Sequence, residues 1–63
     1  MKFKAMITHT DRLENGLIQS QTKHITGSRT AIFNAISDIM IDGEYNLEKE
    51  LIDITVVIKK EEK

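Results

Sequence analysis

The feature that most constrains this fold is one stretch of helical periodicity, residues 28–43, the only long one in the sequence. Its apolar residues recur at intervals of three or four positions and form one stripe, made of Ile32, Ala35, Ile36 and Ile39. Phe33 and Met40 widen that stripe on one flank. A stripe this wide is typical of a helix that packs against a sheet.

Both ends of this stretch carry residues that favour helix boundaries. Ser28 can accept a hydrogen bond from a free backbone N–H of the first turn. Gly43 can adopt the left-handed conformation that ends a helix. We therefore expect a helix over residues 28–42.

Before the helix, residues 2–13 have the period-two alternation of a half-buried strand. Phe3, Ala5 and Ile7 fall on one face, and the other face is polar except for Met6. The dipeptide at residues 15–16, Asn-Gly, favours a tight turn because both residues tolerate positive φ. Residues 17–26 are then the expected return strand.

Two hairpin registers are compatible with this turn. A two-residue turn places His24 on the apolar face of the first strand. A three-residue loop with Gly16 in a bulge instead places Ile25 there, beside Ala5. A shift of one residue exchanges the two faces of a strand. We favour the second register because it buries Ile25.

The hairpin is longer than the helix that would cover it. About 14 helical residues span roughly 21 Å, which six or seven strand residues match at about 3.3 Å each. Residues 10–21 are therefore expected to project as a β-arm. The tip of this arm carries three apolar residues, Leu13, Leu17 and Ile18.

After the helix, Asn46 either caps one further helical turn or leads a loop. Residues 52–60 are rich in β-branched side chains and form the last expected strand. Its alternation predicts a core-facing row, made of Ile52, Ile54, Val56 and Ile58, with Val57 on the other face. Residues 61–63 are a charged tail that we expect to be frayed.

The expected order is ββαβ in one domain, residues 1–63. A right-handed crossover places the last strand beside the first and antiparallel to it. This predicts a small α+β, two-layer fold with a three-stranded, largely antiparallel sheet in the order 2-1-3 and one helix on one face. The third strand is the more hydrophobic outer strand, so edge-to-edge pairing across a two-fold axis is a natural route to a dimer.

Composition also favours self-association. A chain of 63 residues buries a small core, and this one has no cysteines for disulfides and only two histidines. Oligomerisation is the expected supplement, so we expect a homodimer. The sequence shows no signal peptide and no run of membrane-spanning length, which favours the cytoplasm and argues against a membrane partner.

The sequence carries no motif for catalysis, phosphate cradling, calcium binding or metal ligation. In the favoured register His9 and His24 lie on opposite faces, so they cannot share a metal ion. We therefore expect no enzyme activity, no cofactor and no metal site.

Several apolar residues fall on surfaces that this fold leaves uncovered, which indicates an interface. The expected partner or dimer contacts are Met6, Leu13, Leu17, Ile18, Ile41 and Val57. The leading hypothesis is a non-enzymatic protein-interaction or regulatory module, homodimeric, that binds and modulates another macromolecule. In size and style the chain is similar to small phage and mobile-element proteins, an analogy that suggests an inhibitor of a host protein.

The alternative is a nucleic-acid-binding regulator. The net charge of −1 argues against it, but residues 1–31 contain five Lys or Arg and only two acidic residues, which leaves that half basic. Phosphate contacts from the open sheet face would come from Lys2, Lys4, Arg12 and His24. That face lacks the aromatic residues on which bases stack.

Overall fold

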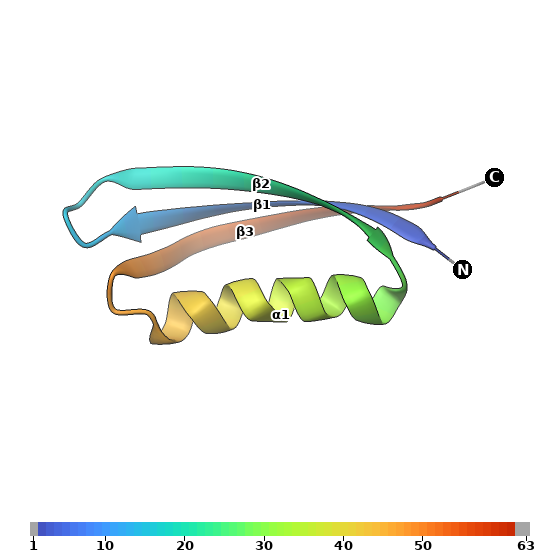
Figure 1. The fold of residues 1–63 in the computed structure, drawn as a ribbon. Helices are drawn as coiled ribbons and strands as arrows, with labels where there is room; N and C mark the ends of the chain where they lie inside the picture. Colours follow the sequence, from blue (N-terminus) through green and yellow to red (C-terminus); the bar gives the residue numbers. More distant parts are fainter. Residues whose placement is uncertain (1, 62–63) are drawn as a thin grey trace.

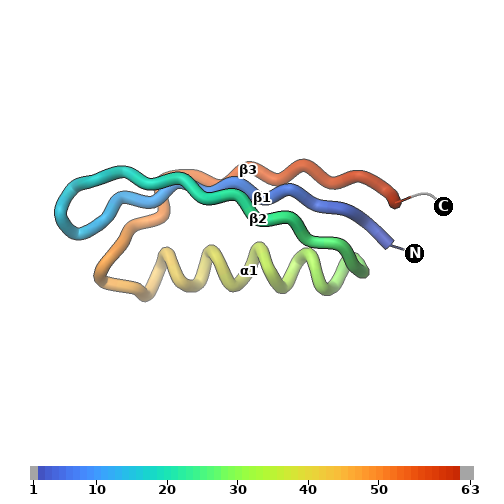
Figure 2. Tube along the Cα trace, turned by 45° about the horizontal axis from the view of Figure 1, so that its top comes forward, coloured from blue at the N-terminus to red at the C-terminus, as the bar shows by residue number. Residues whose placement is uncertain are grey.

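The computed structural model describes residues 2–61, which form three strands and one helix (Figure 1). The elements are β1 (Phe3–Leu13), β2 (Ile18–Gly27), α1 (Arg29–Tyr45) and β3 (Lys49–Lys60). Both strand pairs are antiparallel and the sheet order is β2-β1-β3. The helix lies along one face of the sheet in both views (Figures 1 and 2), which leaves the other face open. The predicted α+β architecture and strand order are confirmed.

The β1–β2 hairpin has the bulged register that the sequence favours. Ala5 lies opposite Ile25, and the Leu13 N–H donates to the carbonyl of Leu17 at 2.7 Å. Gly16 has φ +89°, a left-handed conformation that glycine adopts without strain, and its N–H donates to the Leu13 carbonyl at 2.8 Å. The three-residue loop therefore fixes which face of β2 meets the helix.

Strand β3 contains a bulge that the sequence pattern does not predict. Thr10 lies opposite Asp53, whereas the next residue, Asp11, lies opposite Leu51. Ile52 is therefore the extra residue, and it is 41 % exposed. The prediction that Ile52 belongs to the core-facing row is wrong, because the bulge shifts the alternation by one and Leu51 packs against the core in its place.

The helix begins as predicted but ends later. The Ser28 hydroxyl accepts the N–H of Ala31 at 3.2 Å, which caps the first turn. The helix then continues through Gly43 to Tyr45, so the prediction that Gly43 ends it is wrong. Asn46 ends the helix and leads a loop, with its side-chain oxygen accepting the Glu48 N–H at 2.9 Å.

Gly43 is required for a different reason, which is the close approach of the helix to β3. A Cβ built at Gly43 would overlap the Cβ of Leu51, an atom that cannot move without its backbone. The absence of a side chain therefore sets the helix–strand distance at this end of the domain.

Gly43→Ala should destabilise the protein, although helix propensity alone predicts a gain of about 1 kcal/mol from this change. The overlap with Leu51 should cost about 1–3 kcal/mol, as overpacking does in other cores. Thermal unfolding followed by circular dichroism shows whether Gly43→Ala raises or lowers the stability. Asn34→Ala, at an exposed position of the same helix, is the control and should be neutral or slightly stabilising. A Gly43→Ala variant that is as stable as Asn34→Ala would contradict the close approach.

The core is small and lies between α1 and the central strand. Its buried residues are Ala5, Ile7, Ile32 and Ile39. Partly buried residues surround them, namely Phe3, Ile25, Ala35, Ile36, Leu51, Ile54 and Val56. Phe33 and Met40 do not belong to this core, because they are 54 % and 52 % exposed on one flank of the helix.

The hairpin tip projects beyond the helix in Figure 1, but it is better supported than predicted. Strand β3 begins at Lys49, three residues before the predicted start, and pairs with β1 as far as Leu13. The Glu14 N–H also donates to the Glu48 carbonyl at 2.9 Å. At the other end of the sheet, the Glu61 N–H donates to the Lys2 carbonyl at 3.0 Å, and the remainder of the predicted frayed tail lies outside the described residues.

Candidate functional site

The outer side of β3 is an unpaired strand edge within residues 2–61. The Glu61 N–H points towards β1, where it bonds to Lys2. The N–H and C=O of one residue point to the same side of a strand, and this side alternates along the chain. The backbone groups of Ile54, Val56 and Ile58 therefore point away from β1, towards the open edge. Such an edge is a template for pairing with another strand.

Exposed apolar side chains lie beside this edge. Ile58 is 45 % exposed, and it lines a hollow of about 180 Å³ together with Phe3, Arg29, Ile32 and Phe33. Met40 follows Phe33 by seven residues and lies on the same flank of the helix. We call the set Phe33, Met40, Ile54, Val56 and Ile58 the β3 edge surface. It combines free backbone groups with the exposed side chains of Phe33, Met40 and Ile58 and the partly buried side chains of Ile54 and Val56.

On the open sheet face, Met6 of β1 lies directly opposite Val57 of β3, and both side chains are exposed. Farther along this face the hydroxyls of Thr8 and Thr22 lie 3.2 Å apart, and those of Thr10 and Ser20 lie 2.9 Å apart. Met6 and Val57 thus form a small apolar patch on the open face, and cross-strand hydroxyl pairs occupy the part nearer the hairpin tip.

The predicted basic residues do not form one patch. Lys4, Lys59 and His24 line a hollow of about 270 Å³ together with Met6 and Val57, and Lys2 directly precedes β1 at this end. Arg12 lies near the other end of β1, where its guanidinium is 3.4 Å from the carboxylate of Glu50. The basic end of the open face therefore contains Lys59, which the sequence did not predict, and does not contain Arg12.

The apolar residues predicted at an interface are also dispersed. Met6 and Val57 lie together, whereas Ile18 and Leu17 are exposed near the hairpin turn. Leu13 is partly buried beside Lys49. Ile41 is half-exposed, and nine residues after the buried Ile32 it lies on the opposite side of the helix, so it cannot share a surface with the open face. Phe33, Met40 and Ile58 are surface residues that the sequence pattern does not reveal, because their periodicity is that of a core.

A buried polar pair lies under the helix. His9 and Asp11 occupy the helix-facing side of β1, with their side chains only 5 % exposed and His9 Nδ1 3.0 Å from Asp11 Oδ2. Residues two apart on a strand share a face, which is the sequence signal for this pair. It borders a cavity of about 180 Å³ that is also lined by Gln21, Lys23, Asp38, Ile39, Asp42 and Lys49.

An ion pair closes this cavity near the end of the helix. The Lys49 Nζ lies 2.6 Å from Asp42 Oδ2 and links the start of β3 to the last turns of α1. The hydrogen bond from Lys49 lowers the pKa of Asp42, and the same bond raises the pKa of Lys49. Both groups are thus held in their charged forms, so the buried His9–Asp11 pair has a fixed charged pair beside it.

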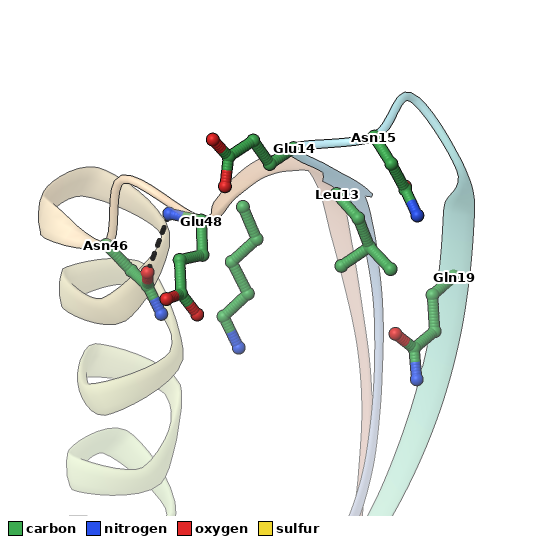
Figure 3. Close-up of a pocket in the computed structure, with 7 residues that line it drawn as sticks. Leu13, Glu14, Asn15, Gln19, Asn46 and Glu48 are labelled. Atoms are coloured by element: carbon green, nitrogen blue, oxygen red, sulfur yellow. Dashed lines mark hydrogen bonds between the residues drawn. The ribbon is translucent and has the colours of Figure 1, made fainter.

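A wide cleft lies between the hairpin turn and the loop that joins α1 to β3 (Figure 3). It has a volume of about 570 Å³ and is lined by Leu13, Glu14, Asn15, Gln19, Asn46, Glu48 and Lys49. The Asn46–Glu48 hydrogen bond shapes one wall. The carboxylates of Glu14 and Glu48 in this cleft are exposed, so water screens their charge. No residue that lines the cleft selects a ligand.

Two further observations concern the described part of the chain. No helix there has the length and apolar character needed to cross a membrane. Among the same residues, no group of three or more His, Asp or Glu side chains is placed to hold a metal ion. Comparison with protein-family models, with curated proteins and with solved structures finds no match, so the chain is interpreted from its own geometry.

Proposed function

We propose that this chain is a non-enzymatic protein-interaction module that works as a homodimer, with the β3 edge surface as its self-association site. The observation that carries the proposal is the coincidence of an open strand edge with uncovered apolar side chains on the same side of the domain. Single exposed apolar residues are ordinary, but several of them beside unpaired backbone groups indicate an interface.

The two outer strands differ in a way that supports this choice. Strand β2 presents mainly Gln, Ser, Thr and Lys side chains and is exposed along most of its length. Charged residues, and lysine above all, protect an edge from pairing. In β3 the charged residues lie at the two ends, in residues 49–53 and 59–60, and residues 54–58 between them are uncharged and mostly β-branched. Pairing through β3 also adds the buried surface that a domain of this size lacks.

The test is the mass of the chain in solution, measured by sedimentation equilibrium over a range of concentrations. The wild type should have the mass of two chains. Phe33→Lys and Met40→Lys place charges in the β3 edge surface and should shift the mass towards one chain. Ile41→Lys, half-exposed on the outer side of the same helix, is the matched control and should remain dimeric. A wild type with the mass of one chain throughout, or an Ile41→Lys variant that dissociates equally, would contradict the proposal.

A nucleic-acid-binding role is the second candidate, and one observation favours it. Two cationic side chains, Lys4 and Lys59, lie at one end of the open face beside His24, and Lys2 precedes Lys4 by two residues. Binding through phosphates would weaken steeply as salt concentration rises and would be lost in a Lys2→Glu/Lys4→Glu variant. Binding that is insensitive to both changes would exclude this role.

A further inference from the structure

We infer that two copies pair antiparallel along β3 about a two-fold axis at Val56, so that Asp53 of each chain lies opposite Lys59 of the other. The inference rests on the proposed function, because it gives the register of the dimer already proposed. It follows from three properties of β3, namely its backbone alternation, its charge pattern and the position of its bulge.

Symmetry restricts the registers that are available. A two-fold axis between antiparallel edge strands is perpendicular to the sheet, so both helices lie on the same side of the joined sheet. Residues that lie opposite each other share a face. The axis must therefore pass through a residue position. A residue n positions before the axis in one chain then lies opposite the residue n positions after the axis in the other chain.

An axis at Val56 matches the side chains on both faces. Ile54 then lies opposite the partner's Ile58 on the helix side, where Ile58 is half-exposed in the single chain. On the open face Asp53 lies opposite the partner's Lys59, and the symmetry repeats this pair of opposite charges. The outward backbone groups of Ile54, Val56 and Ile58 are centred on the axis and can exchange hydrogen bonds with the same groups of the other copy.

The neighbouring registers are worse. An axis at Thr55 places the carboxylate of Asp53 opposite the partner's apolar Val57, and an axis at Val57 places it opposite the partner's Glu61. The bulge at Ile52 interrupts the strand on one side, so regular pairing can extend from Asp53 to Lys59. Val56 is the central residue of that segment.

The helix layer is compatible with this arrangement. The helix packs on β1 through the core, and the two β1 strands would be separated by three strand spacings of about 4.8 Å, or roughly 14 Å. Helices in direct contact lie about 8–10 Å apart, so large side chains are needed between them. Phe33 and Met40 lie on the facing flank, and the two-fold axis would bring Phe33 of one copy near the partner's Met40.

The charge pattern makes the register testable with two single variants, Asp53→Lys and Lys59→Asp. Each variant alone brings like charges together twice in its homodimer, so its dissociation constant should rise by about 10-fold or more at low salt. When the two variants are mixed, each Lys at position 53 meets an Asp at position 59, and each Asp at position 53 meets a Lys at position 59. Native mass spectrometry of the mixture should therefore show the mixed dimer as the dominant species.

Lys2→Asp changes the net charge as Lys59→Asp does, but Lys2 directly precedes the central strand β1 and is not part of β3, so this variant should leave the homodimer intact. A dimeric wild type whose two variants show no preference for the mixed dimer would overturn the register while the proposed dimer stands. A wild type with the mass of one chain would overturn the proposed function itself. The two failures are therefore distinguishable.

Discussion

Ile7→Ala should lower the free energy of unfolding by about 2–5 kcal/mol, the usual range for removing a buried Ile side chain from a core. Ile7 is fully buried on the central strand, between Lys23 of β2 and Val56 of β3 and under the helix. A domain of this length has a total stability of about 3–9 kcal/mol, so the loss should remove a large part of the total stability at 25 °C. Urea unfolding followed by circular dichroism measures the change.

The same substitution at an exposed site is the control for Ile7→Ala. Ile41 is half-exposed on the outer side of the helix, and alanine is the better helix former there. Ile41→Ala should therefore change stability by less than about 0.5 kcal/mol. Equal losses in the two variants would show that the side chain of Ile7 does not occupy the core described here.

His9→Leu should lower the free energy of unfolding by about 3 kcal/mol, which is the second of the two largest expected effects. The substitution removes the partner of Asp11 and leaves a buried carboxylate without its hydrogen bond. Removing one member of a buried polar pair is more costly than removing both, because the remaining group stays desolvated. The double variant His9→Leu/Asp11→Leu should therefore be more stable than His9→Leu alone. Urea unfolding of the wild type and the three variants of this cycle, including Asp11→Leu, measures the coupling.

His24 supplies the comparison for His9, since it is the other histidine and lies exposed on the open face. His24→Leu should leave stability within about 0.5 kcal/mol of the wild type. A His9→Leu variant as stable as His24→Leu, or a double variant less stable than His9→Leu, would contradict the role assigned to the buried pair.

Much of the fold follows from local patterns in the sequence. The alternation in β1, the Asn15–Gly16 turn and the preference for burying Ile25 were sufficient to predict the hairpin register, which is confirmed. The amphipathic stripe correctly identified Ile32 and Ile39 as buried residues of the helix. These features are decided by residues close together in the chain or on one face of one element, which is why periodicity reveals them.

The errors have a common cause, which is contact between elements distant in the sequence. The continuation of α1 beyond Gly43 depends on how closely Leu51 of β3 approaches the helix. The bulge at Ile52 depends on pairing with β1, and no local pattern marks it. The exposure of Phe33 depends on how the helix lies over the sheet, because a helical wheel cannot show where the supporting sheet ends. The sequence predicts the strand edge of the candidate interface, whereas the exposure of Phe33, Met40 and Ile58 beside it emerges only from the three-dimensional arrangement.

Amide hydrogen exchange, measured residue by residue by nuclear magnetic resonance, tests most directly whether two copies pair along β3. The N–H groups of Ile54, Val56 and Ile58 point to the open edge of β3, as those of Ser20, Thr22 and His24 point to the open edge of β2. Pairing predicts that exchange at the three β3 positions slows as protein concentration rises, while exchange at the three β2 positions stays fast. Equally fast exchange at both edges at every concentration would contradict the dimer.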